Sequence, residues 1–292
     1  MNTFARSALL SSVLMIGAAG VSHATTVTYN DFSSTAGLTL VGATATAVTG
    51  DGPILRLTPA AVGQAGAAYS TAPITLGANA TFSTTFKFRF TDTGGIAPAD
   101  GITFVLAASP TGLGTGGGDL GYGGVGNSVA IEFDTFQNGG PDANSNHVAV
   151  DTNGALNNLF LASPGGQQFC GFGSISGDNC MSNGDIWTVT AGYDGTNLTV
   201  RAQDGAGPMF TLINNQPINI SAILGTNTAF LGFTGGTGSG FENHDILSWS
   251  YADTTVLAGI PEPTSWVMMI VGLAGIGAMA RRRINKADVV SS

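Results

Sequence analysis

A set of side chains suited to metal ions lies close together in the segment VAIEFDTFQNGGPDANSNHVAVD, residues 129–151. Asp134, Asn138 and Asp142 offer side-chain oxygen atoms, and the main-chain carbonyl of Phe136 adds another. A hard cation such as Ca²⁺ takes several oxygen ligands in proteins. We therefore expect this part of the segment to bind Ca²⁺.

His147 adds a nitrogen donor to the same segment. With the carboxylates of Glu132, Asp134 and Asp142 it forms a mixed nitrogen and oxygen set, which suits Mn²⁺ or a similar transition-metal ion. Asp134 and Asp142 occur in both sets and are able to bridge two ions. The sequence therefore predicts a centre with two metals.

The secondary structure expected here explains how these donors would meet. Val129, Ile131 and Phe133 alternate with other residues, which is the period-2 pattern of a β-strand with one apolar face. Glu132 and Asp134 would then project from the other face, which cannot belong to a hydrophobic core. The stretch that follows is rich in Gly, Pro and Asn and predicts a loop that carries the remaining donors.

Two further segments have residues able to contact a ligand. Asp100, in Ala99-Asp100-Gly101, directly precedes the apolar stretch 102–108 and is either a turn residue or a ligand acceptor; taken alone it favours a turn. The glycine-rich stretch 113–127 allows main-chain N–H groups to approach a ligand closely. A phosphate loop would need a GK[ST] sequence, which is lacking here, so by itself this stretch indicates a flexible loop.

The rest of the chain predicts one large all-β domain. Its 292 residues, 43% of them hydrophobic and 9% charged, are enough for a substantial core. Short strand-like runs alternate with Gly and Asn turns, and no amphipathic helix is evident, which favours an antiparallel β-sandwich of two sheets. The expected strands are 27–32, 54–58, 80–90, 102–108, 128–136, 147–152, 186–194, 197–203, 228–235 and 245–253.

Two local sequence patterns predict a core strand and a hairpin. Phe82, Phe86, Phe88 and Phe90 alternate with polar or charged residues, which predicts a half-buried strand whose phenylalanines belong to the core. Asp194-Gly195 between two strand-like runs is a hairpin signal.

Charge excludes one class of partner. Residues 25–259 contain sixteen acidic side chains and only four basic ones, a net charge of −12. Such a surface repels phosphate backbones, so we expect no nucleic-acid partner. Bound metal would neutralise part of this charge.

The N-terminus has the organisation of a secretory signal peptide, residues 1–24. Arg6 is followed by an apolar run and by Ser22-His23-Ala24, which is a small-residue cleavage pattern. A first core strand or an anchor helix is the alternative. Export provides an oxidising setting, where the two cysteines, Cys170 and Cys180, predict one disulfide.

The C-terminus predicts a membrane segment with a sorting function. A linker, residues 256–263, contains Pro261-Glu262-Pro263; residues 264–280 are uncharged and just long enough for a transmembrane helix; residues 281–292 form a basic cytoplasmic tail. This arrangement resembles the PEP-CTERM sorting signal of Gram-negative bacteria. The resemblance implies processing by an exosortase-type protease, with transient anchoring in the inner membrane before release to the cell surface or outside. A permanent anchor is the alternative.

Considered together, ADG before an apolar strand, GGGDLG, EFDTFQN with a downstream Asp and His, and LSWSY at 247–251 resemble the legume-type (L-type, concanavalin A-like) lectins. The resemblance covers nearly all of residues 25–255. It implies a jelly-roll sandwich and a Ca²⁺- and Mn²⁺-dependent carbohydrate-binding function without enzymatic activity. The partner would be a glycan or exopolysaccharide of a surface matrix, and members often form homodimers through sheet edges.

The resemblance also assigns roles to individual residues. It implies that the transition metal is bound by Glu132, Asp134, Asp142 and His147, and Ca²⁺ by Asp134, Phe136, Asn138 and Asp142. The implied sugar-binding residues are Asp100, Gly118, Phe136, Asn138, Ser239 and Gly240. It further implies a cis peptide bond between Ala99 and Asp100.

Two other functions compete with sugar binding. A structural matrix protein would retain the fold without sugar affinity. A concanavalin-fold glycoside hydrolase would need two carboxyl groups roughly 5 Å apart. In this chain Gln137 follows Phe136, where a hydrolase needs its second carboxylate, so the sequence argues against an enzyme. The identity of the sugar stays open.

Overall fold

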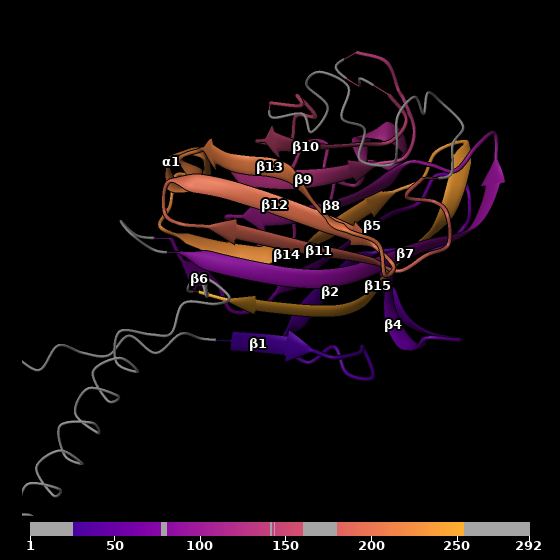
Figure 1. Cartoon of the computed structure of the whole chain (residues 1–292), viewed down its shortest axis with the longest axis horizontal. Helices are drawn as coiled ribbons and strands as arrows, with labels where there is room; N and C mark the ends of the chain where they lie inside the picture. The colour runs from indigo at the N-terminus through magenta and orange to yellow at the C-terminus, as the bar shows by residue number, and fades with distance from the viewer. Residues whose placement is uncertain (1–25, 77–80, 141, 143, 160–179, 254–292) are drawn as a thin grey trace, which may run out of the picture.

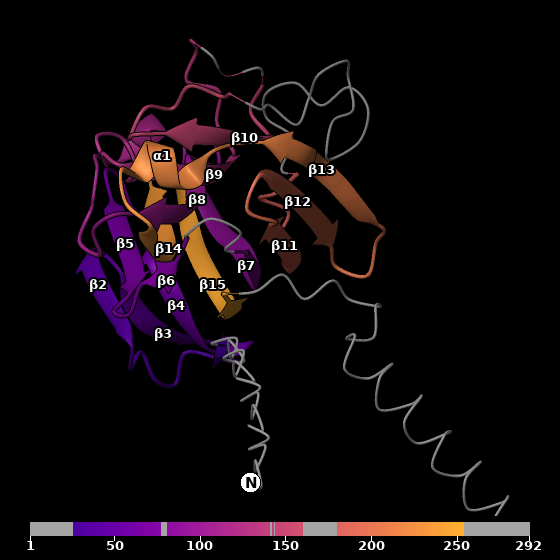
Figure 2. The same cartoon turned by 90° about the vertical axis from the view of Figure 1, so that its left-hand side faces the viewer.

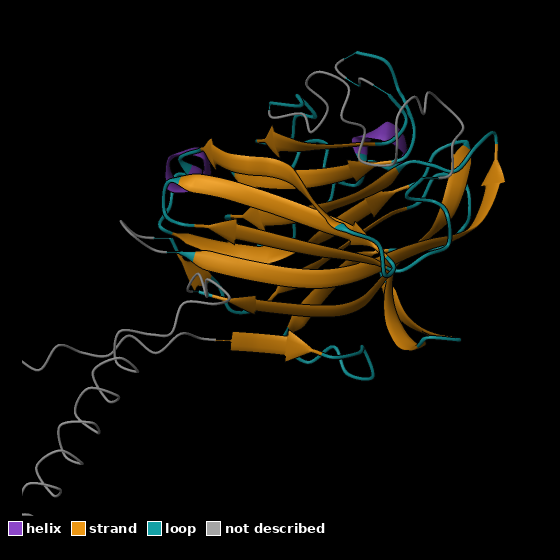
Figure 3. Ribbon diagram, viewed as in Figure 1, coloured by secondary structure: helices purple, strands orange, loops and turns teal. Residues whose placement is uncertain are grey.

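Two antiparallel β-sheets make up the protein, and the predicted all-β sandwich is confirmed (Figures 1 and 3). The structure is a computed structural model that describes residues 26–76, 81–140, 142, 144–159 and 180–253. Figure 2 shows the two layers from another side, with β2 and β5 in one of them and β11, β12 and β13 in the other.

The strand order of each sheet places neighbours that are distant in sequence side by side. From one edge to the other, the eight-stranded sheet contains β13 (Met209–Pro217), β12 (Asn197–Asp204), β11 (Trp187–Tyr193), β7 (Phe82–Gly95), β15 (Gly240–Ala252), β4 (Gly52–Thr58) and β3 (Ala45–Thr49), while β1 (Thr26–Tyr29) also pairs with β15. The seven-stranded sheet contains β10 (His147–Thr152), β9 (Ser128–Asp134), β8 (Gly101–Ala107), β14 (Thr228–Gly236), β5 (Ala65–Ser70) and β2 (Leu38–Gly42), while β6 (Ile74–Thr75) pairs with β14.

The core lies between the two sheets. The four phenylalanines of β7 are fully buried, as their alternation predicted. Phe86 packs against Phe104, Phe133 and Phe233 of the other sheet, with ring centroids 5.0 to 5.8 Å apart. Because such aromatic contacts bury large apolar areas, they hold the two layers in a fixed relation to each other.

Each of the ten predicted strands overlaps an observed one, but β2, β3, β5, β6 and β13 were missed. The sequence of β5, AGAAYS, has small residues and is buried along nearly its whole length, so it lacks an alternating pattern. β3 and β13 are edge strands, where packing constrains the sequence less. Helical structure in the described chain is limited to α1 (Ile220–Leu224), which Asn219 caps, and the short 3₁₀ turn η1 (Gly117–Asp119).

The predicted hairpin is confirmed, because the Asp194-Gly195 turn connects β11 and β12. Asp194 Oδ1 accepts hydrogen bonds from the N–H groups of Thr196 and Asn197, at 2.9 and 2.7 Å, and Gly195 has a φ of 94°. The side chain of Asp194 thus stabilises the turn locally.

Several predicted segments lie outside the described residues: the signal peptide 1–24, the linker 256–263, the helix 264–280 and the tail 281–292. Cys170 also lies outside them, so its disulfide with Cys180 stays a prediction. Among the helices that are described, none has the length and apolar character to cross a membrane.

Candidate functional site

The register of three adjacent strands brings the predicted metal ligands together. Asp134, the last residue of β9, pairs with His147, the first residue of β10, and with Gly101 at the start of β8. Glu132 lies two residues earlier and therefore on the same face of β9 as Asp134. The loop between β9 and β10 thus begins and ends at metal-ligand candidates, as the sequence predicted.

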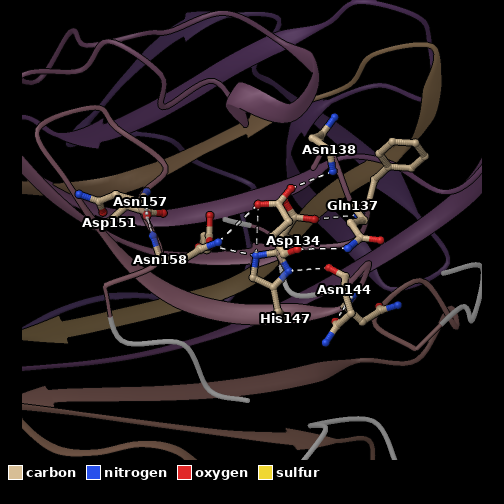
Figure 4. A network of polar contacts seen from close by, with 12 residues as sticks. Asp134, Gln137, Asn138, Asn144, His147, Asp151, Asn157 and Asn158 are labelled. Carbon is tan, nitrogen blue, oxygen red and sulfur yellow. Dashed lines mark hydrogen bonds and ion pairs between the residues drawn. The ribbon is translucent and has the colours of Figure 1, made fainter. Parts of the chain in front are cut away.

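The side chains at this strand end form a compact, buried cluster (Figure 4). One donor atom each from Glu132, Asp134 and His147 lies within 4.8 Å of the others, and all three residues are buried. His147 Nε2 is 3.1 Å from Glu132 Oε1, while Nδ1 is 2.8 Å from the carbonyl oxygen of Asn144. Because that carbonyl only accepts, Nδ1 is the donor in this contact, and Nε2 is the ring nitrogen that faces the acids. This is the orientation that a metal ligand needs.

The loop supplies a second, oxygen-rich group beside this cluster. Asp142 Oδ1 lies 3.9 Å from His147 Nε2, and Asp142 Oδ2 accepts a hydrogen bond of 2.8 Å from the N–H of Asn138. The Phe136 N–H donates to Asp134 Oδ1 at 2.7 Å. The four predicted calcium-binding residues are therefore close together, and Asp142 contacts both groups. These donors fit the chemistry of a hard cation beside a transition metal.

Burial of several acids in one place raises their pKa values. Burial raises the pKa of Glu132 to about 7 and that of Asp151 to about 9, and the charge of Glu132 adds to the effect on Asp151. Burial also holds the pKa of Asp134 well above its usual range, with further contributions from Glu132 and Asp142 that His147 partly offsets. A bound cation would reverse this effect by stabilising the charged carboxylates.

Asp151 belongs to the cluster but was not among the residues predicted from the sequence. It lies on β10 four residues after His147 and hence on the same face, and its carboxyl group is close enough to Glu132 for that residue to raise its pKa. Asp151 Oδ1 also accepts from the N–H groups of Asn157 and Asn158 (Figure 4). The sequence did contain a signal for it: Asp151 lies an even number of residues after His147, which places both side chains on the same face of one strand.

The raised pKa values predict how the metal-free protein responds to pH. Asp and Glu in an unfolded chain have pKa values of about 4, so the pKa values of Glu132 and Asp151 rise on folding. A raised acid pKa stabilises the folded state below the unfolded value, and this contribution is lost as pH rises through the folded value. We expect the free energy of unfolding after EDTA treatment to fall by at least about 1 kcal/mol between pH 5 and pH 9.

Urea unfolding followed by tryptophan fluorescence measures this free energy. Asp151→Asn is the control, and it should flatten the pH dependence above pH 7. Rising stability over this range would contradict the prediction.

The predicted ligand-binding residues outside the metal cluster also converge. Asp100 is 3% exposed and follows a cis peptide bond from Ala99, as predicted. The Asn138 side chain and the Gly238 N–H lie beside the Asp100 carboxyl group and lower its pKa, while Asp100 Oδ2 has no hydrogen-bond partner. A Cβ atom on Gly118 would lie 2.4 Å from Asn138 Cγ, so the backbone of the glycine-rich loop touches this amide. A carboxylate, an amide and a main-chain segment therefore meet at one point.

The loop before β15 also reaches this point, while the sugar-binding roles of its Ser239 and Gly240 stay predictions. A Cβ on Gly238 would lie 3.2 Å from Asp100 Oδ2, so Gly238 is the loop residue against Asp100. Ser239 is exposed, whereas Gly240 is buried against Ala97 and its carbonyl accepts from the Gly238 N–H at 3.1 Å. The main-chain carbonyl of Gly240 is thus occupied within the loop.

Comparison with known proteins shows the family of this chain. The family model of the legume lectin domain matches residues 24–265. The chain belongs to the legume lectin family. The lectin alpha chain of Lablab purpureus is 30% identical over 219 residues, covering 68% of this chain and 72% of the relative. A receptor kinase of Arabidopsis thaliana that contains an L-type lectin domain is 30% identical, but the chain spans only 27% of its length.

Solved structures agree with the family assignment. Peanut lectin, solved with a nine-residue peptide, superposes with a TM-score of 0.63 at 26% identity, covering 80% of this chain and 98% of the other. The legume lectin domain of this chain is a carbohydrate-binding domain and not an enzyme. Residues 259–283 match the PEP-CTERM protein-sorting motif, which marks an exported protein.

Proposed function

We propose that this legume lectin binds a glycan in a Ca²⁺- and Mn²⁺-dependent manner at Asp100, Asn138 and Gly118. The observation that carries the proposal is the buried Asp100 carboxylate, whose Oδ2 atom has no hydrogen-bond partner although a donor amide lies beside it. A buried polar atom without a partner is costly unless something binds to it. A sugar hydroxyl is a fitting occupant, since it both donates and accepts hydrogen bonds.

The chemistry of the remaining residues suits adjacent hydroxyl groups of one sugar. Asp100 Oδ2 would accept from a hydroxyl, while the Asn138 amide and the Gly118 N–H would donate. Phe136 is partly exposed and would offer its ring to the apolar face of the sugar. Ser239, which is exposed, would lie at the rim of the site and influence which sugar fits.

The metal cluster would hold these groups in position. Glu132, Asp134, Asp142 and His147 would bind Mn²⁺, and Asp134, Asn138, Asp142 and the Phe136 carbonyl would bind Ca²⁺. The two ions would supply fixed positive charge that neutralises the buried acids. Asn138 and Phe136 belong to both the calcium set and the sugar set, so metal binding would fix the loop that carries the sugar contacts.

The direction of β15 supports a role at the cell surface, because this strand leads the chain away from the sugar site. β15 begins at Gly240, next to the loop that touches Asp100, and ends at Ala252, which pairs with Thr26 of β1 (Figure 1). Thirteen residues of strand extend about 40 Å. The C-terminal tail would therefore begin far from the sugar site. The lectin could then bind matrix polysaccharide both before and after an exosortase removes the tail.

A glycan array tests the proposal. We expect calcium-dependent binding of the purified domain to at least one glycan, its loss after EDTA treatment, and its return on addition of Ca²⁺ with Mn²⁺. The Asp51→Asn variant, which changes an ion pair with Arg89 on another part of the surface, is the control and should bind normally. Absence of calcium-dependent binding to any glycan would instead support a structural matrix protein.

A further inference from the structure

A second buried acid, Glu242, lies behind the sugar site on β15. Glu242 is fully buried. Its Oε1 atom accepts hydrogen bonds from the hydroxyl groups of Thr135, at 3.0 Å, and Ser182, at 2.9 Å. These donors come from two other segments: Thr135 directly follows β9, and Ser182 lies in the loop that precedes β11. Glu242 therefore connects three parts of the chain that are far apart in sequence.

The surroundings of Glu242 provide little compensating charge. Within the described chain its one ion-pair partner is His244, whose Nε2 is 3.5 Å from Glu242 Oε1 and whose Nδ1 lies 2.7 Å from the Thr58 hydroxyl. Arg56 and Arg89 pair elsewhere, with Asp245 and Asp51. A buried acid of this kind is weak evidence for a role in stability, since an apolar residue often stabilises a core equally well.

The Thr135 side chain and main chain link Glu242 to the sugar site. Thr135 stands between Asp134, a candidate metal ligand, and Phe136. Its hydroxyl is bonded to Glu242, and its N–H donates to the carbonyl oxygen of Asp100 at 2.8 Å. A shift of Thr135 would therefore move Asp100 and Phe136 together.

A third metal site is a poor explanation of this cluster. Asp100 Oδ2, Glu242 Oε2 and His244 Nε2 all lack a hydrogen-bond partner. However, over the part of the chain that the structure describes, the group with metal-binding distances is Glu132, Asp134 and His147. Asp100, Glu242 and His244 are too far apart to share one ion.

We propose that Glu242 is a positioning residue of the sugar site, which holds Asp100 and Phe136 in their binding geometry through hydrogen bonds to Thr135 and Ser182. This inference rests on the proposed sugar-binding function. It assigns Glu242 no contact with the glycan, and it explains why a hydrogen-bonding carboxylate stands at this buried position.

Substitutions of Thr135 and Glu242 test whether the hydrogen bond between these residues positions the sugar site. Thr135→Val keeps the shape and the N–H but removes the hydroxyl, whereas Thr135→Ser keeps the hydroxyl. Glu242→Gln keeps an acceptor oxygen. The matched control is Thr84→Val, because Thr84 is also buried and hydrogen-bonded, to Trp249 and Ser250 on β15 near the chain ends. All variants are compared at saturating Ca²⁺ and Mn²⁺ in the full domain.

Two measurements are made on each variant. For affinity to the best array glycan by calorimetry, we expect a loss of at least tenfold in Thr135→Val, values within threefold of wild type in Thr135→Ser and Glu242→Gln, and no loss in Thr84→Val. For amide hydrogen exchange by mass spectrometry, we expect at least tenfold faster exchange in residues 134–138 of Thr135→Val, and no change there in Thr84→Val.

The exchange measurement separates this inference from the proposed function. If the wild-type protein binds no glycan, sugar binding is refuted, while faster exchange at residues 134–138 still supports positioning by Glu242. If Thr135→Val only lowers the melting temperature and leaves affinity and local exchange unchanged, Glu242 has a structural role alone and the inference is overturned.

Discussion

Asp100→Asn is expected to weaken glycan binding by about 10- to 100-fold, because a hydrogen bond to a charged group contributes roughly 1.5–3 kcal/mol. The substitution keeps the size of the side chain and replaces a carboxylate by an amide. Burial of Asp100 means that water cannot substitute for the lost acceptor. Calorimetry with the best array glycan measures the change.

The same residue predicts a pH dependence that the variant should lose. Burial raises the pKa of Asp100 to about 6, although the charge of His244 and the hydrogen bond from Asn138 partly offset it. Protonation removes the charged acceptor, so wild-type affinity should fall as pH decreases through about 6. Asp100→Asn should show no such fall between pH 7 and pH 5.5 while the metals stay bound. Equal affinity of variant and wild type at pH 7 would exclude Asp100 from the site.

Gly118→Ala is expected to reduce glycan affinity at least tenfold while leaving the melting temperature nearly unchanged. The new Cβ would lie 2.4 to 2.6 Å from the three terminal atoms of the Asn138 side chain. Since that side chain ends at the surface, it can move away without disturbing the core, but it then leaves its position beside Asp100. We therefore expect the substitution to lower glycan affinity and not stability.

The same loop offers a matched control in Gly126→Ala. A Cβ on Gly126 meets nothing within 4 Å, and neither glycine has a positive φ that would strain an alanine. Both changes alter the unfolded chain in the same way. Calorimetric affinity and thermal unfolding of the two variants give the comparison. Equal affinities would show that the glycine-rich loop does not support Asn138 as we propose.

Part of the candidate site could be predicted from the sequence because its residues follow one another along the chain. Glu132 and Asp134 share a strand face by the two-residue period, and the short loop to His147 limits how far the other donors can lie from them. The β7 core strand was predictable for the same reason, since Phe82, Phe86, Phe88 and Phe90 repeat the period. The small residues of β5 gave no such signal, because both of its faces are buried.

Other features depend on contacts between segments that are distant in sequence. The sequence by itself determined which residues have metal-binding and sugar-binding chemistry, and that they belong to an antiparallel sandwich of an exported protein. The tertiary structure decided that Gly238 lies against Asp100, and that Asp151 and Glu242 are buried acids beside the site. The physical reason is that burial and hydrogen bonding are set by the pairing of strands that are distant in sequence, such as β1 with β15 and β4 with β15, and no local pattern along the chain records that pairing.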